Sequence, residues 1–406
     1  MLDQSAAAQA TQSAREGRRD VIVVGHRGAS GVAPENTVAA IREAARQGAD
    51  YAEVDVVLSK DGVPVLVHDN TLARTTNARE VFPDRAPWTV GDFTLAELRT
   101  LDAGSWFDES FAGERVPTFR EALEAFDQYG IGVWLELKGA GRHPDFAPAV
   151  AEVPRTTPGG WLTAPDRERR FVATSFDWET LATFADLIDH AVPIGGIAEA
   201  VPDDAKLREL SGWMDFFIPH YRRLAQGDIV RIRAAGLRPA FWTPNDPVAV
   251  ASLVAQGADA LIQNYPALAR AVVDGLPPVP GPASVVVERL AGGSGGGSGA
   301  DSAAGATSVA AAETSRYVVL RNISDAAVDV GGWYLRDDPG YRLPIGAGYT
   351  IPAGGALSVH VGPGTNAPDC YHSDPPVVDF SRGRNSVALH RADGVVVDVA
   401  GDEPTA

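Results

Sequence analysis

Short apolar runs alternate with amphipathic stretches from about residue 21 to residue 274. The strand candidates are, in order, VIVVG, AEVDVVL, PVLVHD, GVWLELK, FVATSF, MDFFIPH, LRPAFWT and ADALIQNYP. Between most of them, apolar residues recur at helical spacing. Repeated strand and helix over this length predicts an α/β fold, an eight-stranded (β/α)8 barrel of the TIM type. A doubly wound open sheet is the alternative.

Two segments depart from this alternation. AEVDVVL and PVLVHD are separated by SKDG, which predicts a β-hairpin. Residues 70–116 are too long for a connection between a strand and a helix, so we expect a small insertion over the mouth of the barrel. Its apolar face is formed by large rings, Phe82, Trp88, Phe93, Trp106, Phe107 and Phe111. Most of them are expected to form the insertion's own core; alternatively one or two, with Phe82 and Trp88 favoured, line a channel for an acyl or alkyl chain.

The pattern changes beyond the barrel, which is expected to occupy residues 21–275. Residues 276–315 contain a long Gly, Ser and Ala-rich stretch that predicts a flexible linker. Residues 316–406 consist of short alternating strands between Gly, Pro and Asp turns, which predicts an immunoglobulin-like β-sandwich. The polar residues 1–20 are expected to be disordered.

Composition narrows the classes of function. The 406 residues are 45% hydrophobic, enough for more than one core. The net charge of −18 disfavours binding to nucleic acid or to an anionic membrane surface, because such a protein repels phosphate groups. No apolar run approaches the length of a membrane span. The single cysteine, Cys370, excludes an intrachain disulfide and a cysteine zinc site, and is expected to be a bystander.

Two histidines stand where strands are expected to end. VIVVG runs directly into His26 and Arg27, and the hairpin strand ends with His68 and Asp69. A single histidine in such a place is usually a hydrogen-bonded structural residue. Barrel enzymes, however, carry their reacting groups at the carboxyl ends of strands. The two histidines together are therefore candidates for a general base and a general acid.

Three carboxylates accompany the histidines. Glu53 and Asp55 are two residues apart in one strand, so both point to the same side, and Glu136 lies in the next parallel strand. Converging carboxylates repel one another unless a cation lies between them. Oxygen ligands alone favour a hard divalent cation, Ca²⁺ or Mg²⁺, over zinc. With Arg27 and Lys138 beside it, this pocket would suit a phosphate, which indicates metal-assisted phosphodiester cleavage.

Several separated motifs resemble the glycerophosphodiester phosphodiesterase family. They are GHRGA, PENT, EVDVVLSKDGVPVLVHD, RTT, LDAGSWF, GERVPTFREAL, LELK, TSFD, WTPN and GADALIQNYP, between about residues 21 and 270. The resemblance implies a barrel with an insertion after the second strand, and hydrolysis of glycerophosphodiesters to sn-glycerol 3-phosphate and an alcohol. It also implies that Glu53, Asp55 and Glu136 bind one divalent cation and that His26 and His68 are the acid/base pair.

The resemblance further implies that Arg27 and Lys138 contact the phosphate and that Trp242 forms an aromatic wall of the substrate site. Two positions depart from the family pattern. WTVN is usual where this chain has WTPN, with Pro244. TDYP is usual where it has QNYP, with Asn264 in place of an acid. Both are expected at the barrel mouth, so they bear on substrate preference more than on the reaction.

The C-terminal strands resemble a lamin-tail-like domain, in YVVLRNISDAAVDVGGWYLRDD and YTIPAGGALSVHVGPG. Such domains are appended to secreted or surface hydrolases. The resemblance implies a secreted or cell-surface protein with contact to the cell surface through this domain, although no signal peptide is visible and the cytoplasm is the alternative. Its histidines, His360, His372 and His390, are expected at the surface.

Three functions compete at this point. The first is hydrolysis of glycerophosphodiesters. The second is a lysophospholipase D activity on lysophospholipids, which the long EVFPDRAPW segment favours. The third is a non-catalytic surface binding protein, which the complete set of polar motif residues disfavours. The expected partner is thus a small-molecule glycerophosphodiester or lysophospholipid, with no nucleic acid and no stable membrane insertion.

Overall fold

The computed structural model describes residues 21–139, 145–163, 170–278, 284–291, 317–373 and 386–401. The chain divides into two compact units at Pro278. The segment 1–20 and the Gly, Ser and Ala-rich stretch at 292–316 lie outside the described residues. Among the helices that are described, none is long and apolar enough to cross a membrane.

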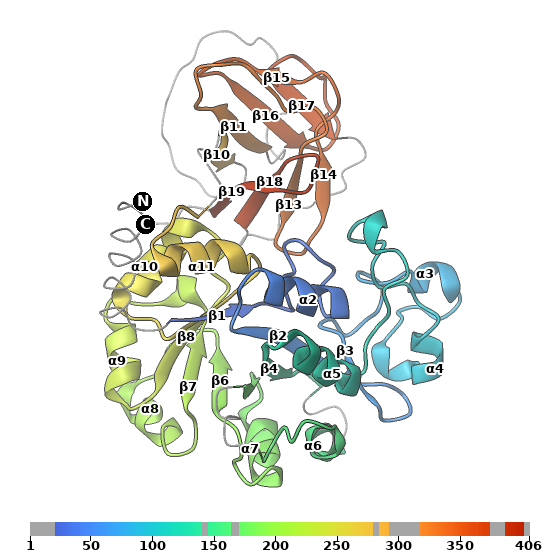
Figure 1. Cartoon of the computed structure of the whole chain (residues 1–406), viewed down its shortest axis with the longest axis vertical. Helices are drawn as coiled ribbons and strands as arrows, with labels where there is room; N and C mark the ends of the chain where they lie inside the picture. The colour runs from blue at the N-terminus through green and yellow to red at the C-terminus, as the bar shows by residue number, and fades with distance from the viewer. Residues whose placement is uncertain are drawn as a thin grey trace, which may run out of the picture. The chain divides into compact units, whose positions relative to one another are not determined.

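Eight parallel strands close into a barrel in the first unit (Figure 1). They are β1 (Ile22–Gly25), β2 (Tyr51–Leu58), β4 (Gly132–Leu137), β5 (Phe171–Ser175), β6 (Ile194–Ala198), β7 (Phe216–Pro219), β8 (Arg238–Trp242) and β9 (Ala260–Gln263). Because β1 pairs with both β9 and β2, the sheet has no open edge among these strands. The TIM-type barrel is confirmed, and the doubly wound open sheet is excluded.

Helices surround the barrel (Figure 1). They are α2 (Val38–Arg46), α5 (Phe119–Tyr129), α6 (Phe146–Thr156), α7 (Trp178–Leu187), α8 (Asp204–Leu210), α9 (Asp228–Ala234), α10 (Pro247–Gln256) and α11 (Pro266–Asp274). Helix α5 shows how the sequence sets such bounds. Thr118 and Glu121 form a capping box at its start, and Gly130, with φ of 65°, ends it. Its buried face, including Phe119 and Phe126, belongs to the large core around the barrel.

The inside of the barrel is filled by a second cluster of apolar side chains. Tyr51, Trp134 and Phe216 belong to it, and the rings of Tyr51 and Trp134 meet edge to face at 5.8 Å. Side chains alternate along a strand. Glu53 and Asp55 lie two and four positions beyond Tyr51, and Glu136 lies two beyond Trp134. These three residues therefore also face the interior, one layer nearer the carboxyl end of the strands.

One barrel strand and two helices were not expected from the apolar pattern. Strand β6 reads IGGIA, and glycine is poor in strands. Packing explains its glycines, because a Cβ at Gly195 would lie 2.8 Å from Ile218 Cδ1 and a Cβ at Gly196 would lie 2.7 Å from Met214 Sδ. The two helices are α6 and α8, which follow β4 and β6. Conversely, β3 (Pro64–Leu66) forms the expected hairpin with β2 and stands outside the parallel ring.

The insertion at residues 70–116 has a core of its own. It contains two short helices, α3 (Ala78–Val81) and α4 (Leu95–Leu98), beside β3 (Figure 1). Phe93 is buried in this core, and Phe82 and Trp88 pack against it. The rings of Phe82 and Phe93 are 5.2 Å apart. Phe82 and Trp88 therefore have packing partners inside the insertion, and their role as channel-lining rings stays a prediction.

The second unit is a β-sandwich, as predicted. One sheet has the order β10-β11-β16-β17 and the other β14-β13-β18-β19, with the pair β12–β15 beside them. The strands are β10 (Val285–Ala291), β11 (Tyr317–Asn322), β12 (Val328–Asp329), β13 (Tyr334–Asp337), β14 (Arg342–Pro344), β15 (Thr350–Ile351), β16 (Ala356–Val361), β17 (Cys370–Ser373), β18 (Ser386–His390) and β19 (Val396–Gly401). Strand β10 falls within the range 276–315 expected to be linker, so this unit starts before the Gly, Ser and Ala-rich stretch.

The histidines of the sandwich differ in environment. His390 is only 1% exposed, and its ring stacks on Tyr334 at 4.7 Å. Its expected surface position is wrong, because this end of β18 is buried. His360 and His372 are half-buried, and so is Cys370.

Candidate active site

A tight turn after β1 directs His26 and Arg27 into the mouth of the barrel. Arg27 and Gly28 have φ of 54° and 84°. A Cβ at Gly28 would lie 2.5 Å from the Cβ of Ala40 in α2, so this close approach requires glycine. The turn points the backbone N–H of Arg27 at Glu53, and it donates to Oε2 over 2.6 Å. The end of β1 is thereby fastened to β2.

Glu53, Asp55 and Glu136 form a buried cluster inside the carboxyl end of the barrel. Asp55 and Glu136 are partners across β2 and β4. One ligand oxygen from each of the three side chains lies within 4.8 Å of the others. Burial and the neighbouring carboxylates raise the pKa of Glu53 and of Glu136. Without a cation, Glu53 and Glu136 therefore favour the protonated form, whereas nearby positive charge lowers the pKa of Asp55 in spite of its burial.

The oxygens of this cluster fit a hard divalent cation. Glu53 Oε1 and Asp55 Oδ1 are buried and have no hydrogen-bond partner among the described residues. The second oxygen of each is held, Glu53 Oε2 by the Arg27 backbone and Asp55 Oδ2 by Asn36 Nδ2 at 2.8 Å. Each of these two carboxylates thus has one fixed and one available oxygen. Such an all-oxygen donor set is the one that Ca²⁺ and Mg²⁺ prefer.

Two cationic side chains flank the carboxylates. Lys138 Nζ lies 2.9 Å from Glu136 Oε1 and 3.7 Å from Asp55 Oδ1. Arg27 Nε lies 3.7 Å from Asp55 Oδ2 and makes no hydrogen bond with the described residues although it is buried. These groups provide positive charge and an available N–H donor for a phosphate oxygen.

A chain of charged hydrogen bonds orients His68. Its Nδ1 lies 2.8 Å from Asp69 Oδ1, and Arg74 Nε donates to Asp69 Oδ2 over 2.7 Å. Arg74 Nη1 donates to Glu35 Oε2 over 2.7 Å, and Arg27 Nη1 to Glu35 Oε1 over 2.9 Å. Burial would raise the pKa of Glu35, but Arg74 and Arg27 lower it to about 2. With Nδ1 committed to Asp69, Nε2 of His68 is the atom available for proton transfer.

His26 is oriented by a neutral partner. Its Nδ1 lies 2.8 Å from Asn264 Oδ1. An amide oxygen only accepts, so Nδ1 carries the proton and Nε2 is an acceptor. Burial and the charge of Arg27 lower the pKa of His26 to about 3. Asn264, where this chain departs from the family pattern, is therefore hydrogen-bonded to a candidate catalytic residue.

Trp242 lies in an aromatic group at the end of β8. Its ring meets Phe176 at 5.4 Å and His220 at 4.6 Å, both edge to face. Phe176 is 43% exposed, and Lys138 Nζ lies 5.8 Å from its ring. Phe176 therefore connects Trp242 to the predicted phosphate side of the site.

The structure thus brings the predicted His26, Arg27, Glu53, Asp55, His68, Glu136 and Lys138 together, with Trp242 adjoining through Phe176. Sequence reasoning did not single out several residues that hold these groups: Glu35, Asn36, Arg74, Phe176 and His220. Glu35 and Asn36 lie in PENT, Arg74 in RTT and Phe176 in TSFD, so the motifs contained the signal.

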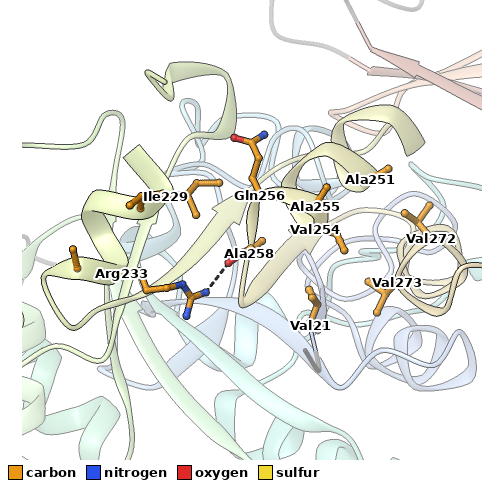
Figure 2. A pocket seen from close by; sticks show the side chains of 13 residues that line it. Val21, Ile229, Arg233, Ala251, Val254, Ala255, Gln256, Ala258, Val272 and Val273 are labelled. Carbon is orange, nitrogen blue, oxygen red and sulfur yellow. Dashed lines mark hydrogen bonds between the residues drawn. The ribbon is translucent and has the colours of Figure 1, made fainter. Parts of the chain in front are cut away.

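A different hollow, of about 880 Å³, is not a candidate for this chemistry (Figure 2). Val21 and Ala258 line it and directly precede β1 and the start of β9, so it lies at the amino-terminal end of the strands. Barrel enzymes carry their active sites at the opposite end. Arg233, the charged residue in its lining, is bonded to Gly257 O and to Asp259.

Comparison with known proteins decides the family. The model of the Glycerophosphoryl diester phosphodiesterase family matches residues 26–268. The chain belongs to this family. It is therefore a hydrolase of phosphoric diesters, from a family that generally depends on a divalent metal. The Lamin Tail Domain model matches residues 279–403.

Individual members of the glycerophosphoryl diester phosphodiesterase family cover the barrel. The protein YhdW of Bacillus subtilis is 34% identical over 247 residues, 60% of this chain and 94% of that protein. A glycerophosphodiester phosphodiesterase of the same organism is 31% identical over 63% of this chain and 87% of its own length. The structure of an Oleispira antarctica phosphodiesterase in complex with the product sn-glycerol-3-phosphate has a TM-score of 0.56 and 33% identity, over 62% of this chain and 96% of that one.

Proposed function

We propose that this chain hydrolyses glycerophosphodiesters to sn-glycerol 3-phosphate and an alcohol, with a divalent cation bound by Glu53, Asp55 and Glu136. The observation that carries the proposal is the cluster of three buried carboxylates, two of which have an oxygen without a hydrogen-bond partner among the described residues. The structural similarity to an enzyme solved with sn-glycerol-3-phosphate supports this class of product.

In this proposal His26 is the general base and His68 the general acid. His26 is neutral at physiological pH and offers Nε2 as a proton acceptor. The carboxylate of Asp69 holds Nδ1 of His68 and so orients the ring, which can give a proton to the leaving alcohol from Nε2. Arg27 and Lys138 offset the charge of the phosphate. When bound, the cation would act as a Lewis acid on a phosphoryl oxygen.

A lysophospholipase D activity is the second candidate, because Phe176 and Trp242 offer apolar surface beside Lys138. Choline release from glycerophosphocholine and from a lysophosphatidylcholine separates the two. We expect a higher kcat/KM for glycerophosphocholine, since the insertion's rings Phe82 and Trp88 pack into their own core. A preference for the lysophospholipid that disappears in Phe176→Ala would establish the lipid activity instead.

The resemblance to lamin-tail domains also supports a secreted or cell-surface location, and we propose that the second unit serves there rather than in hydrolysis. The two units have separate cores. A chain ending at Pro278 should therefore keep its kcat and KM for glycerophosphocholine. Loss of turnover in a shortened chain with unchanged circular dichroism of the barrel would show that the second unit contributes to the site.

We expect Asn264→Asp to move the acidic limb of the pH profile of kcat/KM upward. A carboxylate at Nδ1 stabilises the imidazolium, so the pKa of His26 would rise above its present value of about 3. A general base is inactive once protonated, and activity would then be lost at a higher pH. Asn264→Ser, which introduces no charge, is the control. An acidic limb that stays in place would mean that His26 is not the base.

A further inference from the structure

The second unit carries a cluster of metal-ligating side chains of its own. His360 is on β16, and Cys370 and His372 are on the neighbouring strand β17. The two strands are parallel, and His360 lies directly opposite His372. Cys370 and His372 are two residues apart, so their side chains leave the strand on the same side. One ligand atom from each of the three residues lies within 4.8 Å of the others.

We propose that His360, Cys370 and His372 bind one transition-metal cation of the zinc class, through two imidazole nitrogens and a thiolate. Cys370 Sγ lies 3.4 Å from His372 Nε2. Tetrahedral zinc, with bonds of about 2.3 Å to sulfur and about 2.0 Å to nitrogen, places such a pair of ligand atoms about 3.5 Å apart. This pair is thus at ligand spacing already, and a ligand atom of His360 lies within 4.8 Å of both.

The two imidazoles are held beside each other. Their rings stack on each other at 4.5 Å with 19° between the ring planes, and Tyr317 stacks on His360 at 4.7 Å. Because a metal lies in the plane of each imidazole that binds it, one of the two rings has to rotate for both to share a cation. A Cβ at Gly364 would lie 2.0 Å from His372 Nδ1, so the Gly364 backbone covers that side of the ring. The Nδ1 atoms of both histidines are buried without a hydrogen-bond partner among the described residues, which is unusual for imidazole nitrogens.

The ligand types select the metal. Thiolate and imidazole suit zinc and its neighbours in the first transition series, whereas Ca²⁺ and Mg²⁺ require oxygen. Three protein ligands leave a fourth position for water. Metal binding requires neutral imidazoles and a thiolate, so a bound cation would displace the proton of the Cys370 thiol.

This inference is independent of the proposed phosphodiesterase activity, and it revises the view of Cys370 as a bystander. A single cysteine cannot form a zinc site made of cysteines alone. Pairing of β16 with β17, however, places two histidines beside Cys370. Strand β17 is an edge strand of its sheet. A bound cation would tie this strand to β16 and stabilise the second unit against unfolding.

The experiment is a titration of the metal-free full chain with Co²⁺, followed by displacement with Zn²⁺. Cys370 is the only cysteine of the chain, so a thiolate-to-cobalt charge-transfer absorption reports this site and not the barrel carboxylates. We expect the absorption to saturate at one Co²⁺ per monomeric chain and to disappear on addition of one equivalent of Zn²⁺.

Variants assign the ligands. Cys370→Ser should abolish the absorption, and His360→Gln and His372→Gln should each weaken Co²⁺ binding by at least about 100-fold, more than the loss of an outer-shell partner. His190→Gln, at an exposed histidine of the barrel, is the control. The proposal is overturned if the unaltered chain gives no thiolate absorption at saturating Co²⁺. It is also overturned if the absorption survives loss of both histidines, or forms only in dimers.

Discussion

Alanine in place of His26 or His68 should lower the turnover of glycerophosphocholine by about 10²–10⁴-fold, the usual contribution of a positioned acid or base. Each ring has one nitrogen committed to a partner, Asn264 or Asp69, and the other nitrogen available. Removing either ring takes away a proton-transfer group without removing a carboxylate of the cation cluster. The measurement is kcat for each variant, with circular dichroism to verify the fold.

His190→Ala is the matched control, because this histidine is exposed and its ring pairs with Asp186, which lies four residues earlier in the chain. It should leave kcat unchanged. If His26→Ala or His68→Ala kept more than about a tenth of the turnover, that histidine would not be an acid or a base in the reaction.

We expect exhaustive chelation to abolish the activity and either Ca²⁺ or Mg²⁺ to restore it. The reason is electrostatic: Glu53, Asp55 and Glu136 are buried together, and a cation removes their mutual repulsion. Because the pKa of Glu53 and of Glu136 is raised, protons compete with the cation, and the cation concentration needed for half-maximal activity should increase as pH falls.

Add-back of each ion separately to the chelated protein identifies the preferred one. Glu53→Gln should need far more cation than the unaltered protein, whereas Glu152→Gln, at an exposed position of α6, should not differ from it. Full turnover after chelation would contradict a role for the cation.

The residues of the catalytic face could be predicted because a parallel barrel leaves little freedom in where strand ends meet. Two-residue spacing put Glu53 and Asp55 on one side of β2, and the register of β2 with β4 put Glu136 opposite Asp55. Apolar runs marked seven of the eight barrel strands. Strand β6 was missed because its glycines are required by contacts with Ile218 and Met214, which lie far along the chain.

The supporting residues could not be predicted from spacing, because their contacts depend on irregular backbone. Asn36 reaches Asp55 from a turn in which its own φ is 56°. Arg74 comes from the insertion and bonds to Glu35 and Asp69. In the sandwich, the parallel pairing of β16 with β17 departs from the antiparallel pattern. No periodicity in the sequence therefore indicated that His360 lies beside Cys370.

The hydrogen bonds from Arg74 to Asp69 and to Glu35 make the activity depend on the thermal stability of the insertion. Arg74 belongs to the insertion, whose small core packs against Val57 at the end of β2 and is distinct from the large core around the barrel. If that small core melts first, Arg74 no longer fixes Asp69, and His68 loses its orientation while the barrel remains folded. Loss of activity on heating would then precede loss of barrel helicity, and the interval between the two temperatures would measure how strongly the insertion is held.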